Sequence, residues 1–501
     1  MNVKRLHTVY FLGVGGIGMS AIARYFNSLA CKVVGYDKTK TILTESLETE
    51  GIEIHYEENI DLIPLTIKKQ EEGTLVIYTP AIPKDNKEFV FLNEQGMKLW
   101  KRSEVLGLIS QNYFTIAVAG THGKTTTSSI VAHILNESGV NCIAFLGGIS
   151  LNFNSNLLLN QSSQPSQLKA ENKERLSENT ESTNFSDDIK PPPSVLVVEA
   201  DEYDRSFLTL SPDIALITSI DADHLDIYGD ENSMKEAYSE FAGKIKEGGK
   251  LITKQFIIDQ LSIRSDVQVS SYSVADKSDT FVKNMRIEKG NYVVDVNAKK
   301  SLTKNIKIGL PGIHNVENAI GAFAIGEKIG IEPSKIKKAL ATYKGVYRRF
   351  ETHVKTKDIV YIDDYAHHPS ELEMTIQSVK ELYPGKKITG VFQPHLYTRT
   401  RDFVEEFAEN LSMLDELILM EIYPARELPI EGVTAQIVLD KVKCSSKSIV
   451  AKEELLKELA KKNIEVLLTL GAGDIDVFVK PIKELLLKQP LLGGDLKSAD
   501  E

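Results

Sequence analysis

The chain is poor in cysteine, has more acid than base and lacks any long hydrophobic run. Its three cysteines, Cys31, Cys142 and Cys444, are far apart in 501 residues, which argues against a disulfide framework and suits a reducing cytoplasm. No apolar segment approaches the roughly 20 residues of a membrane-spanning helix, and the N-terminus leads into a strand rather than a signal peptide. The net charge of −11 argues against nucleic acid or an anionic membrane as the main partner. We therefore expect a large cytoplasmic enzyme.

The most informative motif is a glycine-rich turn between a strand and a helix. The run 114–118 predicts a buried strand, 128–135 has a helical pattern, and Ala119-Gly-Thr-His-Gly-Lys-Thr-Thr-Thr127 lies between them. Such a turn aims backbone N–H groups and the positive end of a helix at phosphate. Lys124 would reach the β- and γ-phosphates, and the Thr125 hydroxyl would hold Mg²⁺. The first glycine of the strict phosphate-loop pattern is absent, so this is a shortened variant that predicts an ATP site.

A second phosphate-binding candidate lies near the N-terminus. Gly13-Val-Gly-Gly-Ile-Gly18 follows a predicted strand at 9–12 and precedes a helix at 19–29, and the next strand, 32–36, ends in Asp37. This is the dinucleotide-binding fingerprint, with an acid placed for a ribose hydroxyl. Taken alone it indicates NAD and hence a dehydrogenase, but a UDP-sugar satisfies the same geometry. Glycines needed only for close packing of helix on strand are a third interpretation.

Polar clusters follow two further strands. Glu199 comes directly after the apolar run 194–198, and an Asp/His cluster that includes His224 comes after the run 214–218. Because the carboxyl ends of parallel strands line the ligand crevice of an α/β sheet, both clusters should converge on the phosphate loop. Carboxylates at that edge suit Mg²⁺. A solvated acidic loop would explain either cluster alone, but it explains both together less well.

The C-terminal third repeats this arrangement. Four predicted strands, each ending in a polar motif, lie at 358–362, 388–392, 416–420 and 465–470. Helical segments between them predict a second doubly wound sheet. Six of the ten histidines, at positions 122, 224, 314, 367, 368 and 395, fall in strand-end or helix-start motifs, whereas core histidines would be scattered. No His-x₃-His or cysteine pair supports a tetrahedral zinc site.

These patterns predict an α/β protein of three domains. We expect a Rossmann-like domain over 1–110, a central phosphate-loop domain with a parallel or mixed sheet over 111–343, and a second Rossmann-like domain over 344–501. The stretch 152–193 is rich in Ser, Asn, Gln, Glu and Lys and ends in three prolines. Such a segment cannot bury enough apolar surface to offset its ordering entropy. We expect it to be a disordered insertion in the central domain.

The motifs together resemble the Mur ligase family of peptidoglycan synthesis. The resemblance covers essentially all of the chain apart from 152–193, and it rests on the loop Gly120–Thr127 and on four segments similar to the alanine-adding branch: Gly13–Ser20, Asp363–Pro369, Gln393–His395 and Tyr423–Glu427. It implies ATP-dependent ligation of L-alanine to the lactyl carboxylate of UDP-N-acetylmuramate through an acyl phosphate. A family member that adds a different amino acid or a recycled murein peptide is the alternative, and a dehydrogenase would leave Lys124 without a role.

The resemblance also implies roles for individual residues. Catalysis would depend on Lys124, Glu199, His224 and Arg349. ATP would contact Gly120, Thr121, His122, Gly123, Lys124, Thr125, Thr126, His314, Asn315, Asn318, Arg349 and Asp364. The UDP substrate would contact Gly13, Gly15, Gly16, Gly18, Met19, Ser20 and Asp37. The amino acid and the carboxylate would be oriented by Tyr365, His367, His395 and Arg399. Mg²⁺ or Mn²⁺ would be held by Thr125, Glu199 and His224. We expect a monomer or a homodimer.

Two positions depart from the family pattern. Several members have a carbamylated lysine about fifteen residues after the metal-site histidine, but Ser239 stands there and Lys235 is out of register. We therefore do not predict that modification. Many alanine-adding members have an arginine directly after the histidine of the Gln-Pro-His motif, where this chain has Leu396. Arg399 and Arg401 are then the cationic candidates. The amide pair Asn315 and Asn318 at a predicted helix start could also serve only as a cap.

Overall fold

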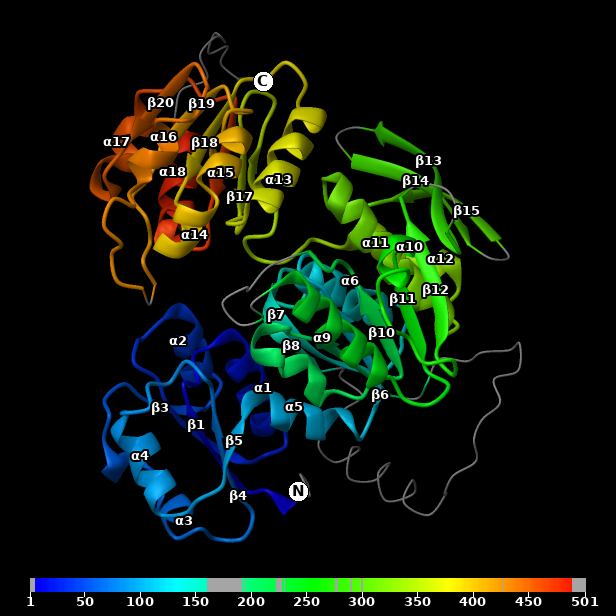
Figure 1. Cartoon of the computed structure of the whole chain (residues 1–501), viewed down its shortest axis with the longest axis vertical. Helices are drawn as coiled ribbons and strands as arrows, with labels where there is room; N and C mark the ends of the chain where they lie inside the picture. The colour runs from blue at the N-terminus through cyan, green and yellow to red at the C-terminus, as the bar shows by residue number, and fades with distance from the viewer. Residues whose placement is uncertain are drawn as a thin grey trace, which may run out of the picture. The chain divides into compact units, whose positions relative to one another are not determined.

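The computed structural model describes residues 5–159, 192, 194–221, 228, 230–274, 278–288, 291–298, 301–425 and 427–488. The chain divides into two compact units. The first comprises Met1–Arg286, Val293–Gly309 and Glu317–Val346, and the second comprises Ile287–Tyr292, Leu310–Val316 and Tyr347–Glu501. The described residues form three β-sheets (Figure 1). None of their helices combines the length and apolar character needed to cross a membrane.

The first sheet has five parallel strands in the order β3-β2-β1-β4-β5. Its strands are β1 (Thr8–Leu12), β2 (Lys32–Tyr36), β3 (Glu53–His55), β4 (Thr74–Tyr78) and β5 (Leu99–Lys101). The helices between and after them are α1 (Ile17–Ser28), α2 (Ile42–Thr49), α3 (Leu65–Lys68), α4 (Lys87–Glu94) and α5 (Arg102–Ser110). Every residue of β1 is buried, as expected for a parallel strand covered on both faces. The predicted Rossmann-like arrangement is confirmed.

The central sheet has ten strands in the order β15-β14-β13-β12-β11-β10-β6-β9-β7-β8. They are β6 (Phe114–Ala119), β7 (Cys142–Ser150), β8 (Ser155–Leu159), β9 (Val195–Glu199), β10 (Ile214–Ile217), β11 (Lys250–Thr253), β12 (Gln268–Ser273), β13 (Thr280–Glu288), β14 (Asn291–Ala298) and β15 (Ser301–Lys307). The accompanying helices are α6 (Lys124–Glu137), α9 (Glu231–Gly243), α10 (Gln255–Ile258), α11 (Ile313–Lys328) and α12 (Pro333–Thr342). In the sheet order, the strands β12, β11, β10, β6, β9 and β7 are mutually parallel. The pairs β14–β15 and β7–β8 at the two ends are antiparallel, so the sheet is mixed, as predicted.

Strand β8 corrects the prediction that 152–193 is a disordered insertion. Residues 155–159 pair antiparallel with β7, with Ile143 opposite Leu159, and the three central residues of β8 are buried. The short apolar run Leu157–Leu159 supplies enough buried surface for an edge strand, but the polar composition of the whole stretch concealed it. Most of the predicted insertion, residues 160–191 and 193, lies outside the described part of the chain.

The third sheet has the strand order β16-β17-β21-β18-β19-β20. Its strands are β16 (Glu351–Lys355), β17 (Val360–Asp364), β18 (Ile388–Phe392), β19 (Glu416–Leu419), β20 (Ser446–Ile449) and β21 (Val466–Leu470). The helices are α13 (Pro369–Leu382), α14 (Tyr397–Asp402), α15 (Val404–Leu411), α16 (Ala435–Leu439), α17 (Leu455–Ala460) and α18 (Val479–Lys488). All four predicted strands are present and mutually parallel, and β16 adds an antiparallel edge. The predicted second doubly wound sheet is thus confirmed.

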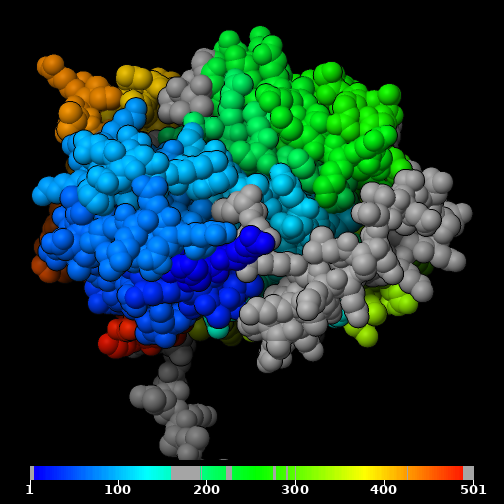
Figure 2. All heavy atoms as spheres, turned by 90° about the horizontal axis from the view of Figure 1, so that it is seen from below, coloured from blue at the N-terminus to red at the C-terminus, as the bar shows by residue number. Residues whose placement is uncertain are grey.

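Helix α1 connects the first sheet to the central sheet within the first unit. Helix α1 contacts both β7 and β8. Arg24 on α1 is buried, donates to the side chain of Asn156 on β8, and binds Glu50 with Nε to Oε2 at 2.8 Å. Figure 2 shows the blue N-terminal atoms against the lighter blue and cyan atoms that follow them in sequence. The sheets fall within the predicted ranges 1–110, 111–343 and 344–501, but the boundaries themselves stay a prediction because the first two sheets share one compact unit.

Candidate active site

The phosphate loop joins β6 to α6 in the predicted strand-turn-helix arrangement. Gly120 has φ +130° and Gly123 has φ +82°, both in the region that favours glycine. A Cβ on Gly120 would collide with Thr218, and one on Gly123 would lie 2.6 Å from the side-chain oxygen of Asn318. Both glycines are therefore required by the backbone and by their neighbours. Lys124 opens α6, so the loop delivers its side chain at the positive end of a helix.

Lys124 is held by the loop and by a buried acid. Its Nζ donates to the carbonyl oxygen of Gly120 at 2.7 Å and to Oε1 of Glu202 at 2.7 Å, and Glu202 is only 1% exposed. Burial alone would lower the pKa of Lys124, but the carboxylates of Glu202, Glu199 and Asp201 hold it above its usual value. The amine is therefore charged and available to phosphate. Glu202 belongs to the acidic segment that follows β9 but is not among the predicted site residues, although it comes only three residues after Glu199.

Thr125 and Glu199 form the described part of the predicted metal site. The Thr125 hydroxyl donates to Oε1 of Glu199 at 3.0 Å, and the Gly147 N–H donates to Oε2 at 2.9 Å. A hydroxyl beside a carboxylate is an all-oxygen donor set that fits Mg²⁺. The third predicted ligand, His224, lies outside the described residues. Within the described residues no group of three or more His, Cys, Asp or Glu side chains could hold a metal ion.

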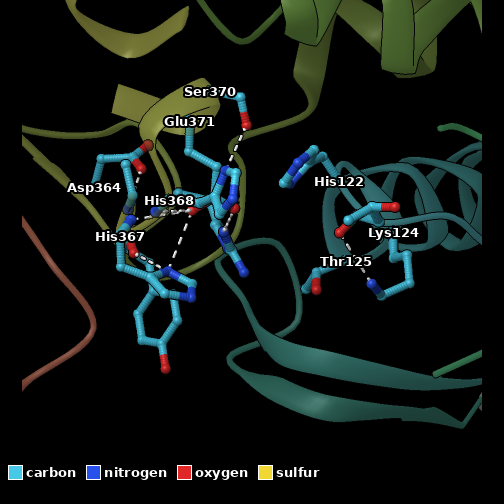
Figure 3. Close-up of polar contacts among 12 residues, drawn as sticks. His122, Lys124, Thr125, Asp364, His367, His368, Ser370 and Glu371 are labelled. Atoms are coloured by element: carbon cyan, nitrogen blue, oxygen red, sulfur yellow. Dashed lines mark hydrogen bonds and ion pairs between the residues drawn. The ribbon is translucent and has the colours of Figure 1, made fainter. Parts of the chain in front are cut away.

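The other phosphate-loop residues are fixed by the end of β10. The Thr121 hydroxyl donates to the carbonyl oxygen of Asp221 at 2.8 Å, and the His122 N–H donates to Oγ of Ser219 at 2.9 Å. Thr126 is buried on α6. Convergence of the phosphate loop with the ends of β9 and β10 follows from their parallel pairing with β6. Figure 3 shows Lys124 and Thr125 at the start of their helix, with His122 in the loop before it.

The predicted UDP-substrate residues fall into two groups: some contact other parts of the protein, and the others line a cavity. Oδ2 of Asp37 accepts the Gly15 N–H at 2.8 Å, so this acid braces the loop. Gly13 has φ +86°. Ser20 is fully buried and its hydroxyl accepts from Nδ2 of Asn156 at 2.9 Å, so it faces β8. The remaining members, Gly16, Gly18 and Met19, line a cavity.

That cavity links the two phosphate-binding motifs. Its volume is about 300 Å³. One side is formed by the glycine loop and the start of α1, and the other by Gly147 within β7 and by Glu199 and Asp201 at and just after the end of β9. Arg102, the first residue of α5, also lines it. A ligand in this cavity would touch both the fingerprint loop and the carboxylate that contacts Thr125.

In the second unit, Asp364 ties together two loops. Its Oδ2 accepts the Phe350 N–H at 2.6 Å and its Oδ1 accepts the Ala366 N–H at 2.7 Å. Burial raises the pKa of Asp364 to about 7, although Arg349 acts in the opposite direction. The guanidinium of Arg349 lies 4.9 Å from the centre of the Tyr365 ring. The structure thus brings together three residues that were predicted to lie near ATP or the amino acid.

The predicted amino-acid residues form a run of adjacent rings. The His367 ring centre is 5.2 Å from that of Tyr365 and 5.9 Å from that of His395. His395 in turn stacks on Tyr423, with their ring centres 5.8 Å apart. Tyr423 is not among the predicted site residues. Oε2 of Glu371 accepts the backbone N–H of His367 at 3.0 Å. Figure 3 labels both residues. Arg399 lies on α14, which begins two residues after His395.

The start of α11 places the remaining candidates. Packing around His314 lowers its pKa to about 4, against the opposing effect of Glu371, so the ring is neutral near pH 7. Nδ2 of Asn315 donates to the Pro311 carbonyl oxygen at 2.6 Å, a contact that stabilises the helix start. Asn318 lies against Gly123 of the phosphate loop. Asn318 thus lies beside the phosphate loop within the first unit.

The fold and this site define a nucleotide-binding α/β protein with its phosphate loop in a central mixed sheet. Three family models match: the Mur ligase family catalytic domain at residues 8–114, the Mur ligase middle domain at 118–326 and the Mur ligase glutamate ligase domain at 348–473. The chain belongs to the Mur ligase family, and the resemblance seen in its motifs is confirmed.

Relatives match along nearly the whole chain. The UDP-N-acetylmuramate–L-alanine ligase of Flavobacterium johnsoniae is 47% identical over 97% of this chain and 99% of its own length. The enzyme of the same name from Cytophaga hutchinsonii is 46% identical over 97% and 98%. Among solved structures, the UDP-N-acetylmuramate–alanine ligase MurC of Thermotoga maritima aligns with a TM-score of 0.75 at 25% identity, covering 96% of this chain and 100% of that one.

Proposed function

We propose that this protein joins L-alanine to the lactyl carboxylate of UDP-N-acetylmuramate and converts ATP to ADP and phosphate. The observation that carries the proposal is the cavity lined by both Gly18 and Glu199. Because Glu199 contacts Thr125 of the phosphate loop, a sugar nucleotide seated on the glycine loop would present its carboxylate near the γ-phosphate. The names of the full-length relatives support the same substrates.

The first step transfers a phosphoryl group from ATP to the carboxylate. Such a transfer needs alignment and charge neutralisation more than covalent help from the protein. Lys124 would exchange its contact with Glu202 for the β- and γ-phosphates. Thr125 and Glu199, with His224, would hold Mg²⁺ or Mn²⁺, whose charge would neutralise the phosphate oxygens. His314, Asn315, Asn318, Arg349 and Asp364 would complete the ATP site.

The second step forms the amide. The amine of L-alanine attacks the acyl carbon, the new C–N bond forms, and the C–O bond to phosphate breaks with loss of inorganic phosphate and a proton. Tyr365, His367, His395 and Arg399 would orient the amino acid. We place the reaction in the cytoplasm, in a protein that is a monomer or a homodimer with domains at 1–110, 111–343 and 344–501.

The test is product formation with each substrate omitted in turn. ADP and phosphate should appear only when UDP-N-acetylmuramate and an amino acid are both present, and a panel of L-alanine, L-serine, glycine and murein tripeptide should rank L-alanine first. Preference for the tripeptide would instead indicate the peptide-recycling alternative. Reduction of a nicotinamide cofactor with no ADP release would contradict the proposal.

A further inference from the structure

Gly18 is hard to explain by its own backbone. It is the second residue of α1, and its φ is not among the positive values, so the backbone there does not need glycine. Its closest neighbour is Arg102: a Cβ on Gly18 would lie 2.6 Å from Nη1 and 3.0 Å from Cδ of that arginine, so a side chain there would make the guanidinium shift. The last glycine of the fingerprint therefore makes room for a guanidinium, in addition to any close packing of helix on strand.

Arg102 is also poorly placed for the helix that it begins. A cation at the first position of α5 opposes the helix dipole, so the helix itself gives no reason for it. Its Nη2 donates to Oδ2 of Asp201 at 3.0 Å, and its side chain is 22% exposed. A guanidinium has five N–H donors, and Nη1 lies over the glycine loop at the cavity wall.

The charges around the cavity are unbalanced for an anionic substrate. Among the described residues that line it, Glu199 and Asp201 are acidic and Arg102 is the basic one. The proposed sugar nucleotide carries a diphosphate that must lie against the loop of Gly16 and Gly18. A planar guanidinium beside that loop matches phosphate oxygens with two parallel hydrogen bonds.

We propose that Arg102 binds the diphosphate of the sugar nucleotide, and that Gly18 is glycine because the arginine passes over it. This inference rests on the proposed function and adds a binding residue to it. Asp201 holds the guanidinium in position before the substrate arrives. Once the substrate is bound, the guanidinium of Arg102 contacts both Asp201 and the diphosphate.

A neighbouring ion pair supplies a matched control. Lys101 precedes Arg102 and pairs with Asp204, with Nζ to Oδ2 at 3.2 Å, and both of these side chains are at least 40% exposed. Lys101 does not line the cavity. The two pairs join the same two segments of the chain, so Lys101→Ala removes a bridge of the same kind without removing a diphosphate ligand.

The experiment measures equilibrium binding by calorimetry, without ATP, on the full chain. Arg102→Ala should weaken binding of UDP-N-acetylmuramate by about 10- to 100-fold, as expected for loss of a charge-assisted contact. Arg102→Lys should show an intermediate loss of affinity, and Lys101→Ala should stay within about twofold of the wild type. The affinity for ATP should be unchanged in all three variants, and their melting temperatures report folding. Equal, small losses of affinity in Arg102→Ala and Lys101→Ala would overturn the inference. They would show that Arg102 only joins two segments of the fold.

Two further arms separate the alternatives. UDP-N-acetylglucosamine has the diphosphate but lacks the lactyl carboxylate, so Arg102→Ala should weaken its binding to the same degree; a loss confined to UDP-N-acetylmuramate would contradict the diphosphate assignment. Gly18→Ala should weaken binding by a larger factor in the wild-type background than in Arg102→Ala, because part of its effect comes from displacing the arginine. Failure of the wild-type protein to bind any of these nucleotides would instead contradict the proposed function.

Discussion

Replacing Lys124 should separate catalysis from stability, because the residue serves both. Its side chain is 14% exposed, and its amine is paired at 2.7 Å with the carboxylate of Glu202, whose side chain is 1% exposed. Lys124→Ala therefore removes the proposed phosphate contact and also leaves a buried acid without its cation. A second substitution, Glu202→Gln, replaces that acid by a neutral amide without restoring the amine.

The two effects have different sizes. Loss of a charge-stabilising donor in phosphoryl transfer costs about 3–4 kcal/mol, or roughly 10²- to 10³-fold in turnover. Breaking one side of a fully charged buried ion pair costs about 3–5 kcal/mol of stability. Burial raises the pKa of Glu202 to about 7, so the acid left behind can take up a proton and the loss should lie below that range. We expect Lys124→Ala to lose both, and Lys124→Ala/Glu202→Gln to recover most of the stability while remaining equally inactive.

The assay follows ADP release with saturating UDP-N-acetylmuramate and L-alanine, together with denaturant unfolding of each variant. Glu202→Gln alone is the control and should keep measurable turnover, since Lys124 remains. Near-normal turnover in Lys124→Ala would refute the ATP assignment. Recovery of turnover in the double variant would show that Lys124 acts only through folding.

Three other predictions concern single substitutions. Gly123→Ala should raise the Kd for ATP at least tenfold, measured by calorimetry, because a left-handed φ of +82° costs about 1–3 kcal/mol for alanine and its Cβ would press on Asn318; unchanged affinity would contradict the required turn. Arg348→Ala should destabilise the second unit by about 3–5 kcal/mol in denaturant unfolding, because this buried arginine pairs with Asp363 at 2.9 Å; Arg401→Ala, whose pair with Asp402 is about half exposed, should have little effect. Burial raises the pKa of Asp364 from its usual 3.8 to about 7, so the folded state holds a proton that the unfolded state releases, and this contribution to stability should fall as pH rises from about 4 to 7. Asp364→Asn should flatten that fall, and an unchanged profile of melting temperature against pH would contradict it.

The sequence predicted the parts of the site that are local. A strand, a glycine turn and a helix are consecutive in both phosphate-binding motifs, and each turn is dictated by a few residues, such as Gly120 and Gly123 with positive φ. Convergence of Glu199 with the phosphate loop also follows from a general rule, since parallel strands end at one edge. The hydrogen bond from the Thr125 hydroxyl to Oε1 of Glu199, at 3.0 Å, agrees with that expectation.

The parts that the sequence could not provide depend on distant partners. Arg102 is far in sequence from Gly18 and belongs to no motif, so its contact with the fingerprint is visible only in three dimensions. Ser20 lies inside a matching motif but faces Asn156 of a strand that composition had concealed. Average polarity over 152–193 hid the five residues of β8 because a short edge strand needs only a few buried leucines.

The measurement that tests the central claim most directly is the transfer of oxygen from the carboxylate to phosphate. UDP-N-acetylmuramate labelled with ¹⁸O in its lactyl carboxylate would be incubated with the protein, ATP, Mg²⁺ and L-alanine, and the released phosphate and the nucleotide product would be weighed by mass spectrometry. An acyl phosphate predicts phosphate with one ¹⁸O atom and a product heavier by one alanyl residue that keeps one labelled oxygen. Unlabelled phosphate, or ADP release without the alanyl product, would contradict the account.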